Sequence, residues 1–324
     1  MRLWILLLAV CFLGTSCNAE DEIAVELPPP SFYNDDMIAS DSVSLSYETY
    51  MSLNPSQTKY SAQGGACYGD YFIQGFNYNS VIDIYDLKIK KFITQIEIPS
   101  PKKNSRYHSN TIGFGKEKYS EDDFFPLLYI NSGYSSSTNS NVYYVFAYRL
   151  LLSIDSIGNK TFAIEHVQTI ELSGFSTNSW IEAMVDSDKT SFWVKYNRSG
   201  YPTFAKFPIP DPHEVRVFVS QEHMTGEFSI SKQSVVSHNQ GHFIFNNRIY
   251  IPSGVPSWNE PILLFVINLE KKARELIINL ADYGLVNSVN PCDNYYEPES
   301  IFIYEGKLML AYRRVIYAID IEIK

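Results

Sequence analysis

The chain has 324 residues, of which 45% are hydrophobic, 15% are aromatic and 19% are charged. Its formal net charge of −10 argues against binding of nucleic acid or of an anionic membrane through basic patches. Its length and apolar content are sufficient for a large hydrophobic core.

The N-terminal residues 1–16 have the pattern of a secretory signal peptide. Arg2 supplies the positive charge, and the apolar run LWILLLAVCFL is too short to span a membrane. The segment LGTSC, which ends at Cys17, resembles the lipobox of bacterial lipoproteins, although Gly14 stands where Leu is usual. We therefore predict lipid attachment at Cys17. Cleavage after Ala19, which would remove Cys17, is the alternative.

Residues 17–40 are predicted to be a tether, because they are acidic, lack periodicity and contain three prolines at positions 28–30. An acidic run after the lipidated cysteine resembles the surface-export signal of some Gram-negative lipoproteins. We expect an outer-membrane lipoprotein, on the cell surface or facing the periplasm, held to the membrane by its lipid alone.

Five short polar segments, called tags here, recur along the rest of the chain. Each precedes an apolar run, a tight turn and a second run rich in Tyr, Phe and Ile. Recurrence at intervals of tens of residues is typical of repeat architectures. The tags are residues 63–65, 108–110, 180–182, 238–241 and 297–300.

Each repeat contains the signals of four antiparallel strands. The fourth repeat reads GHFIF, the turn Asn246–Asn247, RIYIPSG, ILLFVINL, the turn EKKA and RELIINL. Asn and Gly suit tight hairpin turns, and short runs of β-branched and aromatic residues favour strands. In the second repeat NVYYVFAYRLLL is predicted to be a core strand. In the third repeat we predict VRVFV, residues 215–219, as the fourth strand.

The fifth repeat ends one strand short, and the run VSLSYETYM at residues 43–51 can supply the missing strand. Ring closure by an N-terminal strand removes the open edges of a β-propeller. We therefore predict an all-β fold, a five-bladed β-propeller over residues 41–324 closed by an N-terminal strand. A β-sandwich or a β-solenoid is the alternative.

In a propeller the first strand of each blade lines the central axis, so the tags would converge at one axial end. Convergent polar groups in a concave mouth suit a polar ligand. The alternative is that they bind neighbouring backbone and tie the blades together. The candidate ligand-binding residues are Gln63, His108, Asn110, Glu182, His238, Gln240, Glu297 and Glu299.

Several phrases resemble a known group of proteins. QGGACYGDYFIQG, HSNTIGFG, PLLYINSG and EPESIFIYEGKLML are similar to segments of the five-bladed propellers of phage receptor-binding and teichoic-acid-associated proteins. The resemblance implies binding of surface glycans or related polymers, without a transferable catalytic set. The candidate site residues that match the phrases of this group are Gln63, His108, Asn110, Glu297 and Glu299. The lipoprotein signal departs from the phage setting.

We predict a monomeric, non-enzymatic lipoprotein that binds a polysaccharide or another cell-surface polymer at the axial mouth. One alternative is a glycan-cleaving enzyme that uses Glu182 with Glu297 or Glu299 as acid and base. Another is a scaffold that binds a protein partner. The nucleophile motif G-x-S-x-G and the zinc motif H-E-x-x-H do not occur in the sequence.

No cofactor is predicted, with two metal alternatives left open. His238 and His242 lie four residues apart and could share a strand face, but a zinc site needs further ligands. An axial Ca²⁺ could use the oxygens of Glu182 and Glu299. Cys67 and Cys292 are either two buried thiols or a disulfide across the ring closure.

Overall fold

The computed structural model describes residues 43–53, 61–77, 81–99, 109–132, 143–175, 181–186, 191–231, 238–256, 260–285 and 297–323. The predicted signal peptide at residues 1–16, the tether at 17–40 and Cys17 lie outside these residues, as do His108 and Cys292. The predictions that concern them stay predictions.

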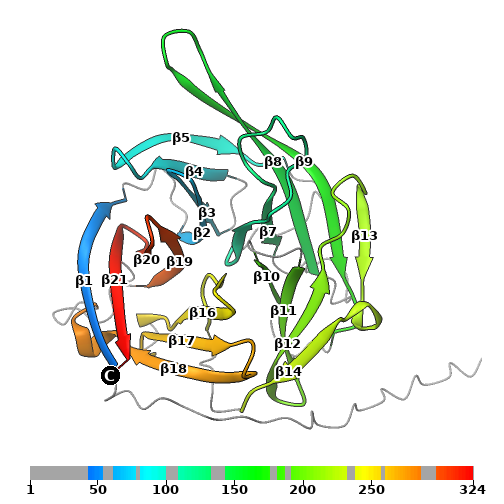
Figure 1. Ribbon diagram of the computed structural model, residues 1–324, viewed down its shortest axis with the longest axis vertical. Helices are drawn as coiled ribbons and strands as arrows, with labels where there is room; N and C mark the ends of the chain where they lie inside the picture. Colours follow the sequence, from blue (N-terminus) through cyan, green and yellow to red (C-terminus); the bar gives the residue numbers. More distant parts are fainter. Residues whose placement is uncertain are drawn as a thin grey trace, which may run out of the picture.

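The described residues form an all-β, five-bladed propeller, as predicted (Figure 1). Five sheets surround a central axis, and within each sheet the neighbouring strands are mostly consecutive in sequence. Blade one is β2–β5, blade two β6–β9 with β13, blade three β10–β12 with β14, blade four β15–β18, and blade five β19–β21 with β1. The strands are β1 (Val43–Ser52), β2 (Ala62–Tyr68), β3 (Tyr71–Phe76), β4 (Val81–Asp86), β5 (Lys91–Glu97), β6 (Ile112–Phe114), β7 (Leu128–Ser132), β8 (Tyr143–Ile154), β9 (Lys160–Leu172), β10 (Glu182–Asp186), β11 (Ser191–Arg198), β12 (Tyr201–Pro208), β13 (Arg216–Val219), β14 (Gly226–Ser229), β15 (Phe243–Phe245), β16 (Arg248–Ser253), β17 (Leu263–Asn268), β18 (Ala273–Asn279), β19 (Pro298–Tyr304), β20 (Lys307–Tyr312) and β21 (Val315–Ile323).

The ring is closed by the N-terminal strand. β1 pairs antiparallel with β21 along its whole length, from Val43 opposite Ile323 to Ser52 opposite Val315. Val43, Leu45 and Met51 are buried, so closure adds apolar contacts to the hydrogen bonds of the ladder. The predicted closure by residues 43–51 is confirmed.

The predicted fourth strand of blade three is wrong. The VRVFV segment forms β13, which pairs in parallel with β9 of blade two, and β14 completes blade three. Pro208 is the last residue of β12, and Pro210 and Pro212 follow it. Proline cannot donate a ladder hydrogen bond, so the chain leaves the sheet here instead of turning back. The outer edge of the long β9 then accepts the segment, with Val219 buried in the core between blades two and three.

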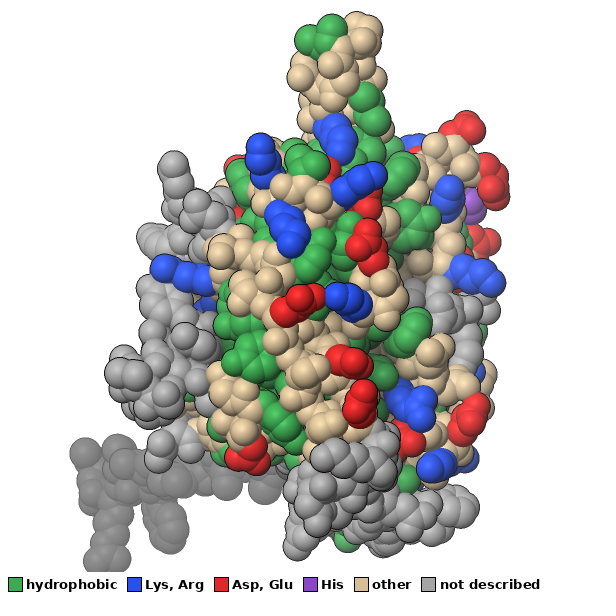
Figure 2. Space-filling model, turned by 60° about the vertical axis from the view of Figure 1, so that its left-hand side comes forward, with side chains coloured by type: hydrophobic (Ala, Val, Ile, Leu, Met, Phe, Trp, Pro, Cys, Tyr) green, Lys and Arg blue, Asp and Glu red, His purple; other side chains and the backbone are tan. Residues whose placement is uncertain are grey.

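Hydrophobic cores fill the spaces between neighbouring blades. Between blades one and five, for example, the rings of Phe72 and Phe302 stack with centroids 4.7 Å apart. The described residues contain no helix that is long and apolar enough to cross a membrane. Figure 2 shows basic and acidic side chains interspersed over the described part of one face, where neither sign gathers into a patch. The long β8–β9 hairpin projects from the ring (Figure 1).

Candidate functional site

The tags lie where the innermost strands begin. The strands β2, β6, β10, β15 and β19 are each the end strand of their sheet, and they contact one another in ring order. Gln63 is the second residue of β2, Glu182 is the first residue of β10, and Glu297 directly precedes β19. Asn110 and Gln240 come shortly before β6 and β15. The described tag residues therefore gather at one axial end, as the repeat predicted.

The main chains of four blades meet at this level of the axis. The amide of Gly241 in blade four donates to the carbonyl oxygen of Glu299 in blade five, at 2.9 Å. A Cβ on Gly241 would lie 2.5 Å from that oxygen and 2.9 Å from the carbonyl oxygen of Asn110 in blade two. A Cβ on Gly64 of blade one would collide with the same Asn110 carbonyl. Only glycine permits this approach, and backbone fills the axis here.

Three tag residues and one arginine form a buried polar network. Arg313 donates from Nε to Glu299 at 2.8 Å and from Nη2 to Glu297, and Gln240 Nε2 donates to Glu297 Oε1 at 2.7 Å. Glu297 is 4% exposed and Glu299 is fully buried. Desolvation raises the pKa of Glu297, and desolvation together with the charge of Glu297 raises that of Glu299 well above its ordinary range. The network joins blades four and five.

A second buried ion pair lies within blade three, beside a histidine of blade four. Lys195 Nζ of β11 lies 2.6 Å from Glu182 Oε2, and the ring of His242 brings Nε2 to 3.4 Å from the same oxygen. Burial lowers the pKa of His242 to about 4, so its ring is neutral at neutral pH. Glu182 therefore pairs with Lys195 of its own blade, whereas Glu297 and Glu299 pair with Arg313.

His238 has a different partner and environment. Its Nδ1 lies 2.6 Å from Glu260 Oε1, and the Glu260 Oε2 accepts from the amide of Val255 at 3.1 Å. The His238 side chain is 42% exposed, whereas that of His242 is fully buried. The two histidines therefore do not form one pair. Among the described residues no group of three or more His, Cys, Asp or Glu side chains could hold a metal ion.

Some buried oxygens at this end have no hydrogen-bond partner in the described structure. Three of them belong to predicted site residues, namely Gln63 Oε1, Asn110 Oδ1 and Glu299 Oε2. Gln63 uses its Nε2 on the carbonyl of Ala62. Unpaired buried oxygens are unusual in folded proteins and are commonly satisfied by water or an ion. The axial Ca²⁺ stays an untested alternative.

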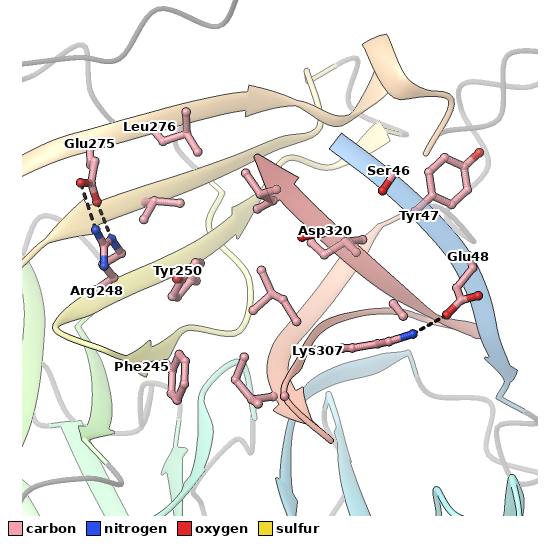
Figure 3. Close-up of a pocket in the computed structure, with 17 residues that line it drawn as sticks. Ser46, Tyr47, Glu48, Phe245, Arg248, Tyr250, Glu275, Leu276, Lys307 and Asp320 are labelled. Atoms are coloured by element: carbon pink, nitrogen blue, oxygen red, sulfur yellow. Dashed lines mark hydrogen bonds and ion pairs between the residues drawn. The ribbon is translucent and has the colours of Figure 1, made fainter. Parts of the chain in front are cut away.

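A cleft of about 740 Å³ opens between blades four and five, at the end of the strands opposite the tags (Figure 3). Its blade-four wall is a cross-strand row in which Tyr250 pairs with Val266 and Val266 with Leu276. Phe245 stands beside this row and is partly exposed. The blade-five wall is the matching row of Ile303, Leu308, Ile319 and Tyr47.

Two ion pairs flank this apolar floor (Figure 3). Arg248 donates to both oxygens of Glu275, at 2.5 Å from Nε and 3.2 Å from Nη2. Glu275 is the extra residue of a β-bulge in β18, because Leu276 pairs with Val266 and Arg274 with Ile267. Bulges re-aim side chains, and here the bulge turns Glu275 toward Arg248. At the other side Lys307 Nζ lies 2.8 Å from Glu48 Oε1.

No pattern in the sequence predicted the cleft. Two signals were available, namely charged residues within largely apolar strands, Arg248 in RIYIPS and Glu275 in ARELIIN. Neither signal indicates that the two side chains meet, since their pairing depends on the register of β16, β17 and β18.

No protein-family model matches the chain, and no curated protein sequence matches it either. Solved structures with some likeness include a glutaminyl cyclase of Myxococcus xanthus, with 10% identity, a TM-score of 0.47, and coverage of 86% of this chain and 97% of that one. A luciferin-regenerating enzyme has 8% identity, a TM-score of 0.44, and coverage of 85% and 95%. A Bacteroides caccae protein of unknown function has 10% identity, a TM-score of 0.39, and coverage of 80% and 73%. Similarity this weak transfers no function to this chain.

Proposed function

We propose that this protein binds a neutral, hydroxyl-rich polysaccharide or similar surface polymer, and that the cleft between blades four and five contacts it. One observation carries the proposal: Phe245 and Tyr250 stand in the cleft beside the Arg248–Glu275 pair. Aromatic faces offer apolar contact to a sugar ring, while a bidentate ion pair holds donors and acceptors in fixed positions. A cleft of about 740 Å³ is of the size that small-molecule sites have.

The charges of the cleft favour a neutral polymer over a polyanion. Its two cationic side chains among the described residues, Arg248 and Lys307, already bind carboxylates. Asp320 adds a further exposed acidic group. An anionic chain would be repelled and would find no unpaired cation among the described residues that line the cleft, so we expect discrimination against teichoic-acid-like and uronic-acid-rich polymers.

The axial mouth remains a second proposed contact. Gln240, Glu297 and Glu299 are buried there and bound to one another or to Arg313, so they would support a ligand site from below. Direct contact would fall to the half-exposed His238 and the half-buried Asn110.

A screen of immobilised glycans combined with product analysis tests the function. The wild-type protein is expected to bind neutral glycans without releasing products. The double variant Phe245→Leu/Tyr250→Leu keeps apolar volume but removes both rings, and should weaken binding about tenfold or more. The control Phe92→Leu/Phe218→Leu removes two exposed rings from other blades and should bind normally.

Three outcomes would contradict the proposal. Exclusive binding of anionic polymers would refute the charge argument, and unchanged binding by the cleft variant would move the site elsewhere. Release of glycan fragments, lost in Glu299→Gln, would favour the enzyme alternative with axial carboxylates.

For the localisation, we propose that the protein is a surface lipoprotein anchored to the membrane at Cys17. Cys17→Ser should release the full-length protein from the membrane fraction, whereas Cys67→Ser should leave it there. A wild-type protein that is already soluble and begins at Glu20 would show that cleavage after Ala19 occurs instead.

A further inference from the structure

A second cavity, of about 370 Å³, lies among the innermost strands and is called the axial cavity here. It is formed where β2 and β6 end and where β15 begins, with Val185 of β10 on the remaining side. The tags lie at the starts of the innermost strands, so the axial cavity lies further along the axis, toward the ends of β2 and β6. It is separate from the cleft between blades four and five, with which it shares no lining residue.

The walls of the axial cavity are apolar and aromatic. Phe114 stacks on Phe125, with ring centroids 5.7 Å apart, and contacts Tyr68 at 5.6 Å. On the blade-four side Phe243 stacks on Phe245 at 6.2 Å. These contacts hold the rings in place, so the cavity has a preformed shape suited to a flat apolar group.

Its charged rim carries one sign. Lys116 and Lys118 are exposed and are the ionised side chains among the described residues that line the cavity. The turn that bears them is fixed, because Gly115 donates to the Leu127 carbonyl at 2.9 Å and Leu127 donates to the Glu117 carbonyl at 2.8 Å. Glu117 lies between the lysines, and its Oε2 is buried behind Gly115, near the ring of Tyr129, so that Glu117 itself does not line the cavity.

The polar groups in the interior of the cavity are uncharged. His242 lines it with a fully buried side chain, and its ring is neutral because burial holds its pKa near 4. Burial also raises the pKa of the Cys67 thiol to about 12, so this wall residue remains a thiol. A ligand would therefore meet an apolar, neutral interior and a cationic entrance.

We propose that the axial cavity binds a small organic anion, whose single apolar ring lies between Phe114 and Phe243 and whose carboxylate contacts Lys116 and Lys118. The protein as a whole is acidic, with a net charge of −10. Lys116 and Lys118 form no salt bridge with a described carboxylate, so their charges at the mouth of an aromatic cavity give a local preference opposite to that of the rest of the molecule. The cavity volume limits the ligand to about one ring with short substituents.

The experiment compares 4-fluorobenzoate with its uncharged counterpart 4-fluorobenzamide by ¹⁹F NMR titration of the whole protein. The acid is expected to bind about tenfold more tightly than the amide, because only the acid pairs with the lysines. In Lys116→Gln/Lys118→Gln this difference should disappear. The matched control Lys88→Gln/Lys91→Gln changes two exposed lysines of blade one and should keep it.

A second variant locates the ligand. Val185→Phe places a ring in the cavity and should abolish binding of both probes. If this variant does not fold, the comparison of the wild type with Lys116→Gln/Lys118→Gln still tests the proposal. The proposal is overturned if neither probe binds at millimolar concentration. It also fails if acid and amide bind equally, or if the double lysine variant binds like the wild type.

Discussion

The amide of Gly241 donates a hydrogen bond to the carbonyl oxygen of Glu299, and this bond links the main chains of blades four and five at the axis. The carbonyl of Asn110 from blade two packs against the same glycine. The Glu299 backbone closes the axis, while its side chain binds Arg313 of the same blade. The side-chain link between the two blades is the hydrogen bond that Gln240 of blade four donates to Glu297, which also binds Arg313. Main-chain and side-chain contacts thus link the same two blades.

Replacing Gly241 by alanine should destabilise the protein strongly. The new Cβ would lie 2.5 Å from the Glu299 oxygen, and that oxygen belongs to backbone that cannot move without breaking the ring. We expect a loss of about 2–4 kcal/mol in the free energy of unfolding, measured by chemical denaturation.

Gly226→Ala in β14 is the matched control, since its Cβ would meet its nearest atom at 3.9 Å. It should cost little. If the two alanine variants were equally stable, the axis would not be filled by backbone as described.

Glu299→Gln should change the dependence of stability on pH. Burial and the charge of Glu297 raise the pKa of Glu299 in the folded protein above its ordinary value of 4.5. The unfolded chain therefore releases this proton first, and the folded wild type loses stability as pH rises from about 4.5 through the raised value. The variant cannot ionise at this position, so its stability relative to the wild type should increase as the pH rises above about 4.5.

Glu275→Gln provides a control of opposite sign. The Arg248 hydrogen bond lowers the pKa of Glu275, so its contribution is present above the ordinary value and is lost as pH falls through the lowered one. This variant should lose stability at neutral pH and approach the wild type in acid. Parallel pH profiles for the two variants would refute the assignment of their environments.

His242→Gln should remove part of the acid sensitivity of the fold. The buried ring has a pKa of about 4, against an ordinary value of 6.5, so the unfolded chain takes up this proton first as pH falls. The wild type should lose roughly 2–3 kcal/mol between about pH 6.5 and pH 4, and the variant should not. Denaturation curves across this range give the comparison. The exposed His213→Gln should behave like the wild type.

Deleting residues 20–53 should abolish cooperative folding, because it removes β1 and opens the ring along the whole of β21. Deleting residues 20–38 leaves β1 intact and should preserve a sharp thermal transition. A stable, soluble product of the longer deletion would show that ring closure by β1 is dispensable.

The sequence by itself determined most of the strand pattern, the number of blades and their closure. Turn residues such as Asn246 and Asn247, which both have positive φ, and the apolar runs on either side act over a few neighbouring positions, so they can be read locally. The missing strand of the fifth repeat likewise followed from counting, and β1 fills it. The axial gathering of the described tags followed from the repeat, because each tag occupies the same place in its unit.

The tertiary structure alone decided what the side chains contact. β13 joins blade two because the edge of β9 was open to it, a property of another blade. Glu275 meets Arg248 only through a bulge, and the cleft exists only because two cross-strand rows of different blades face each other. The sequence made Glu297 and Glu299 candidates for ligand binding at the axial mouth, yet both are buried, bound to Arg313 and close to Gly241. Such contacts depend on distances between blades, which local residue patterns do not encode.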